Sequence, residues 1–181
     1  VVEGGKNLLP KVITENQDTA LVIRNDNQCN WVRSYDKPLN VYLEFIDMEL
    51  LEYRSIGDVT SDDTVRLDSL TVDVREGAGK LDFILKTPLV YCNLHYGTAD
   101  IMLRGRADLC YVFGDGFGRV DNRELQVSQA YVTNRSANDM YLYATLRIGA
   151  TIDNIGNIYY QGNPPEVGLD RNGSGNLIKL D

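Results

Sequence analysis

The sequence is poor in the residues on which metal sites and many enzymes depend. Its 181 residues include one histidine, three cysteines and one tryptophan. Cys29, Cys92 and Cys110 show no Cys-x-x-Cys spacing, which argues against a structural zinc site and against a disulfide framework. His95 has no second histidine or cysteine at ligand spacing, so the sequence predicts no metal site, no catalytic triad and no cofactor.

Basic charge and long apolar runs are also scarce. Asp and Glu number 26 against 18 Lys and Arg, a net charge of −8, whereas nucleic-acid binding depends on clustered Lys and Arg. No run approaches the roughly 20 apolar residues of a transmembrane helix, and no signal peptide is visible. We therefore expect no nucleic-acid partner and no transmembrane segment. Because the chain starts at Val1 and not at Met, we expect an upstream segment.

Helical patterns are nearly absent from a composition that is otherwise globular. Hydrophobic residues make up 43% and charged residues 24% of the chain, which is typical of a folded protein. No window longer than about ten residues keeps a 3.6-residue period without a Gly, Asn or β-branched interruption. Residues 48–53 could form a helical turn, but we expect them to be the entry strand of a β structure.

A repeat of about 20 residues runs through most of the sequence. Its anchor is a small residue that precedes a polar and then an apolar residue. The seven anchors are Gly57, Gly79, Ala99, Gly118, Asn138, Gly156 and Gly175. The intervals between them are 22, 20, 19, 20, 18 and 19 residues, and runs with a two-residue period flank each anchor.

A unit this short cannot bury its apolar face alone, but stacked units form a continuous core. The Leu-x-x-Leu-x-Leu spacing of leucine-rich repeats is missing. The repeat therefore predicts an all-β fold, a single-stranded right-handed parallel β-helix (solenoid) with about 20 residues per coil and rungs about 4.8 Å apart.

Three columns of equivalent residues test this register. The position after the anchor alternates in charge and then becomes neutral: Asp58, Lys80, Asp100, Arg119, Asp139, Asn157 and Asn176. The next position is always apolar and is expected to face inward: Val59, Leu81, Ile101, Val120, Met140, Ile158 and Leu177. Opposite charges on neighbouring rungs are expected to attract by about 0.2–1 kcal/mol. Two residues before the anchor, small residues such as Gly116 and Gly173 predict tight corners with positive φ.

Residues 114–118, Gly-Asp-Gly-Phe-Gly, look like a phosphate-binding loop at first sight. They lack the Lys-Ser/Thr of a Walker loop and open no helix. Their place in the repeat makes them a coil corner, and this interpretation excludes a nucleotide site. The bulky Phe117 stays unexplained, because its column otherwise holds mostly small or β-branched residues.

We interpret residues 1–181 as a single β-helix domain that lacks an upstream segment. Residues 49–181 would form about seven regular coils, and residues 1–48 irregular first coils or a cap with strands at 20–24 and 40–45. A cap is expected because an open solenoid end exposes unpaired backbone groups. Trp31 would be an apolar anchor of this cap, with a sugar-stacking surface aromatic as the alternative.

The sequence also resembles a known family. Residues 156–164 followed by Gly173–Leu177, together with residues 7–12 and 29–33, resemble the head GIN domain of auto-transporter adhesins from gut-type Gram-negative bacteria. The resemblance implies an exported β-helical protein at the cell surface, associated with the outer membrane or periplasmic. It also implies no established catalysis and a lipid anchor upstream of this chain.

The outward column next to the inward one suggests a binding surface. It holds Thr60, Asp82, Met102, Asp121, Tyr141, Tyr159 and Ile178. Tyr141 and Tyr159 should stack on adjacent rungs, with Tyr143 on the same face, and such a strip suits a sugar ring or a protein partner. A purely structural tyrosine ladder is the alternative. We therefore expect a non-enzymatic, adhesin-like module that binds a glycan or a cell-surface protein through Tyr141, Tyr143, Tyr159 and Trp31.

Two questions stay open at this level. Asp82 and Asp121, two rungs or about 9.6 Å apart, could be the acid and base of a pectinase-like hydrolase or lyase on a β-helix. Cys92 and Cys110 are 18 residues apart, so a disulfide between diagonal neighbours is compatible with the register but not specified by it.

Overall fold

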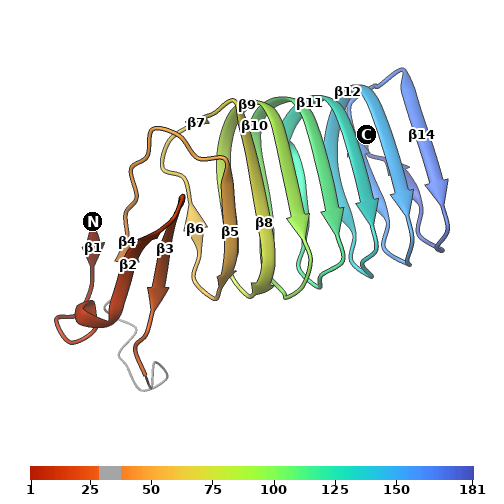
Figure 1. The fold of residues 1–181 in the computed structure, drawn as a ribbon. Helices are drawn as coiled ribbons and strands as arrows, with labels where there is room; N and C mark the ends of the chain where they lie inside the picture. Colours follow the sequence, from red (N-terminus) through yellow and green to blue (C-terminus); the bar gives the residue numbers. More distant parts are fainter. Residues whose placement is uncertain (29–37) are drawn as a thin grey trace. The chain divides into compact units, whose positions relative to one another are not determined.

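The computed structural model describes residues 1–28 and 38–181, and the chain divides into two compact units, Val1–Ile46 and Asp47–Asp181 (Figure 1). Apart from one 3-10 turn, the regular secondary structure of the described residues consists of β-strands. Within the described ranges, the chain forms no helix with the length and apolarity needed to span a bilayer.

The first unit contains four short strands and one helical turn. They are β1 (Val2–Glu3), the 3-10 turn η1 (Leu9–Lys11), β2 (Val12–Gln17), β3 (Ala20–Asn25) and β4 (Asn40–Val41). β1 pairs with β4 and β2 with β3, both antiparallel. Asp18, with φ 53°, makes the tight turn between β2 and β3, because Asp tolerates this left-handed conformation. The predicted strand at 20–24 is confirmed, whereas of 40–45 only the first two residues are strand.

The second unit is the predicted parallel β-solenoid, with about six turns and about 20 residues in each (Figure 1). The sequence predicted about seven coils in this part of the chain, and the structure has about six. Its strands are β5 (Leu50–Ser55), β6 (Val59–Thr60), β7 (Val65–Arg66), β8 (Ser69–Gly77), β9 (Lys80–Leu94), β10 (Asp100–Gly114), β11 (Val120–Asn134), β12 (Met140–Ile152), β13 (Ile158–Gln161), β14 (Glu166–Arg171) and β15 (Leu177–Lys179). All their pairings are parallel.

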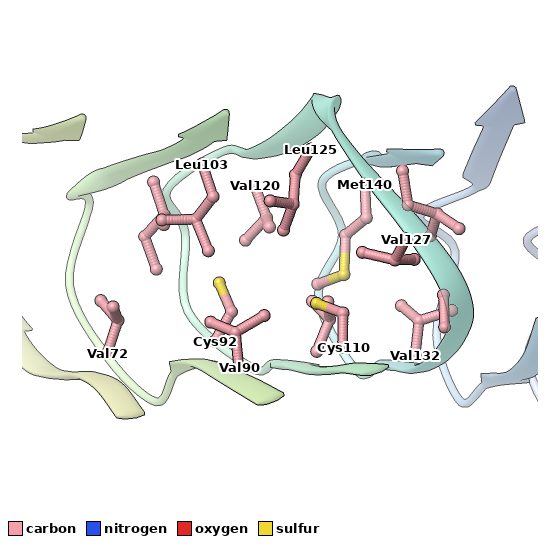
Figure 2. Packing of buried hydrophobic residues seen from close by; sticks show 14 of the residues in the cluster. Val72, Val90, Cys92, Leu103, Cys110, Val120, Leu125, Val127, Val132 and Met140 are labelled. Carbon is pink, nitrogen blue, oxygen red and sulfur yellow. The ribbon is translucent and has the colours of Figure 1, made fainter. Parts of the chain in front are cut away.

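The long strands β9–β12 each serve two sides of the solenoid. Their first halves pair with β6, β13 and each other, and form what we call the first face. Their second halves pair with β8, β14 and each other, and form the second face. In β10 the bend between the two lies at Gly105, with φ 103°. Figure 2 shows the core between the faces, with Leu103 and Leu125 reaching it from one side and Val72 and Val90 from the other.

The predicted inward column is confirmed residue by residue. Consecutive members pair across the rungs from Val59↔Leu81 to Ile158↔Leu177. The five central members are at most 2% exposed, and the two end members are partly buried against the same core. The column is the apolar strip that each coil buries against the next coil, as stacked repeats require.

The corners are small for two reasons, of which the sequence predicted one. Gly77 and Gly97 have positive φ, 118° and 90°, but Gly116 and Gly173 do not, so the prediction was wrong for them. At Gly118 the constraint is space, because a Cβ there would lie 1.9 Å from the Ala99 carbonyl oxygen on the preceding rung. Residues 114–118 are thus a corner packed against its neighbour, where the Phe117 N–H donates to the Gly97 carbonyl at 2.8 Å. Phe117 is 73% exposed, and no contact among the described residues explains its size.

The alternating charges are held by contacts that the sequence did not predict. Each acidic member accepts a hydrogen bond from the backbone N–H of the next rung, as Asp58 does from Lys80 and Asp100 from Arg119, both at 2.8 Å. The cationic side chains of Lys80 and Arg119 instead contact carboxylates two residues further along the chain, each at 2.7 Å. Acids therefore bind the backbone of the next rung, and cations pair within a rung.

Cys92 and Cys110 are free thiols in the core, which settles the disulfide question for this pair (Figure 2). Cys92 pairs in register with Val112 and Cys110 with Val90, so the two lie on adjacent rungs at offset positions. Burial raises the pKa of Cys92 to about 12 and raises that of Cys110 well above its usual range. Cys29 lies outside the described residues.

Candidate binding surfaces

The first face brings Tyr141 and Tyr159 together as the register predicted. The two residues pair across β12 and β13, and their rings stack with centroids 5.0 Å apart and planes inclined by 11°. Both side chains are half-buried. Stacking at this distance turns one face of each ring toward the other ring.

Arginine side chains cover the other face of Tyr141. The guanidinium carbons of Arg119 and Arg123 lie 5.1 and 4.7 Å from its ring centroid. Because β12 lies between β11 and β13 in the sheet, the cations approach from the rung opposite to Tyr159. The Tyr141 ring is held between cations and a second ring, so it offers ligands mainly its edge and its hydroxyl.

The same arginines hold Asp121. Arg123 Nη2 and Arg119 Nη2 lie 2.6 and 2.7 Å from its Oδ2 atom, and the residue is 7% exposed. Burial opposes ionisation, but the hydrogen bonds from Arg123 and the two cationic charges outweigh it and lower the pKa of Asp121. The strip thus carries a compact ion cluster next to its tyrosines.

Asp82 is held in the same way, which bears on the hydrolase alternative. Lys80 Nζ lies 2.7 Å from its Oδ2 and Arg104 Nη2 2.6 Å from its Oδ1. Burial is again outweighed by these cations, and the pKa of Asp82 is lowered. A glycosidase needs a general acid that still carries its proton near neutral pH, which requires a raised pKa. The environments of Asp82 and Asp121 both shift their pKa values in the opposite direction.

Tyr143 occupies the same face but does not extend the stack. It pairs with Gln161 on β13, and its ring lies against Gly162, where a Cβ would meet the Tyr143 Cε2 atom at 2.7 Å. A register shift between β11 and β12 just before Tyr143 accompanies this change. Trp31, the remaining predicted ligand residue, lies outside the described residues.

The second face carries a longer tyrosine ladder that the sequence reasoning missed. Tyr91, Tyr111 and Tyr131 pair in register on β9, β10 and β11. Their ring centroids are 5.1 and 5.3 Å apart, with interplanar angles of 10° and 18°. The signal was present, because the three tyrosines are spaced by 20 residues, the period of the repeat itself.

This ladder ends at a depression. On the next two rungs the same column holds Gly149 and Gly168. The glycines and the Tyr131 ring line a shallow, open depression of about 450 Å³. A Cβ at Gly149 would meet the Tyr131 Cδ1 atom at 2.8 Å, whereas a Cβ at Gly168 would meet no atom closer than 3.8 Å. The Tyr131 ring therefore leans over Gly149, and the space above Gly168 is open.

Polar groups border the depression on both sides. Thr133, Thr151 and Asp170 form the adjoining column on one side and line the depression. On the other side Arg147 forms an ion pair with Glu166, and its Nη1 atom lies 3.4 Å from the Tyr131 hydroxyl. The depression thus combines an aromatic wall, a backbone floor and a row of oxygen atoms.

The lone histidine belongs to a structural cluster. His95 Nε2 lies 2.8 Å from Asp73 Oδ1, and Arg75 Nε lies 2.7 Å from Asp73 Oδ2. The His95 ring also packs against Phe113, with centroids 5.4 Å apart. Within residues 1–28 and 38–181, no group of three or more His, Cys, Asp or Glu residues is placed to hold a metal ion.

Comparisons with known proteins place this fold. The model of the family described as "Putative auto-transporter adhesin, head GIN domain" matches residues 1–164. The crystal structure of a "putative adhesin" from Bacteroides fragilis superposes with a TM-score of 0.86 at 19% identity, covering 99% of this chain and 81% of that one. A "putative lipid binding protein" from Parabacteroides distasonis gives 0.59 at 22% identity, covering 99% and 83%. A search of curated proteins found no significant match. At these identities the two structures support the fold.

Proposed function

Because the chain belongs to the head GIN domain family of auto-transporter adhesins, we propose that it is an exported, adhesin-like binding module without catalytic activity. We place it at the cell surface, associated with the outer membrane or in the periplasm, with a lipid anchor upstream of this chain. Its ligands would be glycans or cell-surface proteins, held on the outward faces of the solenoid. Solenoids often use such extended faces for binding.

The observation that carries this proposal is the tyrosine strip of the first face. Tyr141 and Tyr159 form a stack that Arg119 and Arg123 cover from one side. A rigid, half-exposed aromatic pair loses little side-chain entropy when a ligand covers it, and for this reason tyrosine is common in binding surfaces. Tyr143 and Trp31 are proposed as further ligand contacts of the same module.

The ion pairs of Asp82 and Asp121 support a binding role over hydrolysis. Each carboxylate already accepts hydrogen bonds from two cations, and each has a lowered pKa. A carboxylate that stays ionised and engaged cannot protonate a glycosidic oxygen. We therefore propose that glycans, where they bind, are released uncleaved.

A glycan array combined with a reducing-sugar release assay on the same protein tests this proposal. We expect the parent protein to bind without releasing sugar, and the double variant Tyr141→Ala/Tyr159→Ala to bind at least about tenfold more weakly, as the loss of one good contact implies. Tyr96→Ala is the matched control, because Tyr96 is 68% exposed at a coil corner. Equal binding by the double variant and the parent would exclude the strip of Tyr141 and Tyr159 as the glycan-binding site. Sugar release by the parent would overturn the non-enzymatic function.

A further inference from the structure

The second face supports a more specific inference, which rests on the proposed function as a binding module. We propose that the depression beyond Tyr131 binds one neutral pyranose unit of a glycan. The sugar ring would lie over Gly168 against the Tyr131 ring, and its hydroxyl groups would face Thr133, Thr151 and Asp170. These residues differ from the strip formed by Tyr141 and Tyr159.

The aromatic wall is the first argument. Tyr111 covers one face of the Tyr131 ring. The other face points toward the rungs of β12 and β14, where the column holds Gly149 and Gly168 and no side chain follows. The ladder therefore ends at Tyr131, and the place where a further ring would stack is next to an open depression. A flat, partly apolar ring fills such a gap by continuing the stack, and a pyranose has a C–H face of this kind.

The free face of Tyr131 also separates it from Tyr141. Guanidinium groups and a second tyrosine occupy the two sides of the Tyr141 ring. At Tyr131 the arginine contact goes to the hydroxyl, since Arg147 Nη1 lies 3.4 Å from it. Arg147 therefore contacts the edge of the Tyr131 ring and not its second face, which has the backbone of Gly149 beside it.

The polar column supplies the second argument. Thr133, Thr151 and Asp170 lie at equivalent positions on β11, β12 and β14, so their oxygens are spaced by about 4.8 Å along the depression. Within the part of the chain that the structure describes, none of the three side chains has a hydrogen-bond or ion-pair partner. Hydroxyl groups of a sugar both donate and accept, so they match two threonine hydroxyls and a carboxylate that accepts.

Charge selects the class of sugar. Asp170 carries an unpaired negative charge beside the depression, and Glu166 on the other side already neutralises Arg147. The whole chain has a net charge of −8. A sialic or uronic acid would meet uncompensated repulsion, whereas a neutral hexose would not. The site therefore fits neutral sugars.

Gly168→Val tests the proposal without disturbing the fold. A Cβ at Gly168 has no neighbour closer than 3.8 Å, and valine suits an outward strand position, yet its branches would fill the depression. The matched control is Thr71→Val, which changes the same column at the opposite end of the ladder. Thermal unfolding checks that both variants stay folded.

The measurement is a titration of ¹³C-tyrosine-labelled protein with lactose, cellotetraose, chitotetraose or mannotriose, followed by NMR and by calorimetry. We expect saturable shifts of the Tyr131 ring signals with at least one of these sugars. Gly168→Val and Asp170→Ala should each weaken that binding at least about tenfold, as the loss of one well-formed contact does, and Thr71→Val should leave it unchanged.

Each remaining outcome decides between the two proposals. If a sugar binds the parent and Gly168→Val equally well, the proposed site beside Tyr131 is wrong, but the proposal that the protein binds glycans stands. The variant Tyr141→Ala/Tyr159→Ala then shows whether the sugar binds to the first face. If none of the four sugars binds, the saccharide assignment is overturned and a protein ligand stays open. If N-acetyltyrosinamide shifts the Tyr131 signals in place of the sugars, the depression accepts an aromatic side chain, and the sugar proposal fails.

Discussion

Gly118 and Gly57 occupy the same position of the repeat, but their surroundings differ. A Cβ at Gly118 would lie 1.9 Å from the Ala99 carbonyl oxygen, whereas a Cβ at Gly57 would have no atom within 4 Å. We expect Gly118→Ala to lower the free energy of unfolding by about 1–3 kcal/mol, because the backbone of two rungs must separate. Gly57→Ala should leave it unchanged or raise it by up to about 1 kcal/mol.

Urea denaturation of both glycine variants gives these values. If Gly118→Ala were as stable as the parent, the rungs would be further apart at this corner than the structure shows. A large loss in Gly57→Ala would instead mean that the first anchor has a neighbour within contact distance.

Asp121 should make the stability depend on pH in acid solution. Its folded-state pKa lies below the usual value of 3.8, so the ionised group stabilises the fold at any pH above the unfolded-state pKa. This contribution disappears as the pH falls through the lower folded-state pKa. Asp121→Asn should cost about 1–2 kcal/mol at pH 7, since two half-exposed arginines lose their partner.

The difference between Asp121→Asn and the parent should stay constant from pH 7 to about pH 5 and shrink below about pH 4, near the unfolded-state pKa of aspartate. Unfolding curves across this range measure it. Asp62→Asn, at an exposed position, is the control and should change stability by no more than about 0.5 kcal/mol. A difference that grows in acid would contradict the assigned direction of the shift.

At the scale of elements, the tyrosine ladder of the second face links three strands. Among the residues that the structure describes, Tyr111 stacks on both neighbours, whereas Tyr91 stacks on Tyr111 alone. A stacked pair contributes about 0.5–1.5 kcal/mol beyond its buried area. Tyr111→Ala should therefore lower the free energy of unfolding by about 1 kcal/mol more than Tyr91→Ala.

Chemical denaturation of these two variants, with Tyr96→Ala as the exposed reference, measures this ranking. Tyr96 is 68% exposed, so its loss should change stability by no more than about 0.5 kcal/mol. Equal losses for Tyr111→Ala and Tyr91→Ala would mean that the stacks add nothing beyond burial.

Three aspartates on different strands have the same kind of surroundings. Asp73, Asp82 and Asp121 lie at outward positions, yet each is at most 8% exposed. In each case two basic side chains contact the carboxylate: Arg75 and His95 at Asp73, Lys80 and Arg104 at Asp82, and Arg119 and Arg123 at Asp121. Basic side chains next to each carboxylate thus offset its negative charge. The strands can therefore keep a polar surface without placing unpaired like charges on neighbouring rungs.

At the scale of the whole molecule, the two core thiols report on opening of the solenoid. Cys92 and Cys110 are buried, and burial raises their pKa values, that of Cys92 to about 12. The thiolate is the reactive form, so native protein should react only when it opens. In a Cys29→Ser background, labelling by iodoacetamide at pH 8 should follow the global unfolding measured in urea.

Mass spectrometry of the labelled peptides distinguishes local from global opening. We expect Cys92 and Cys110 to react at the same rate, since they lie on adjacent rungs of one core. Rapid labelling of either thiol in native buffer would contradict the packing shown in Figure 2.

Much of the architecture was accessible from the sequence because a solenoid is close to one-dimensional. Once the period is known, residues such as Leu81, Ile101 and Val120 must fall into one column, and the alternation of polar and apolar residues shows which side is buried. The stacking of Tyr141 on Tyr159 follows from the same arithmetic. The ladder of Tyr91, Tyr111 and Tyr131 has the same period, but it lies on the second face, whereas the anchors directly precede the strands of the first face.

Three features do not follow from a residue's position in the repeat, and they are evident only from the tertiary structure. They are the place where the chain bends, the direction of each long side chain, and the groups that cover each aromatic ring. The bend at Gly105 separates the two faces. A column of the first face and a column of the second face can therefore look alike in the sequence and still have different neighbouring side chains. Arg119 and Arg123 turn onto Tyr141 and Asp121 because rotamers respond to the local packing and charge. Tyr131 keeps one face open because the next two rungs hold glycine at its column position. The sequence shows these glycines, but only the packed sheet shows that they leave a depression beside the ring.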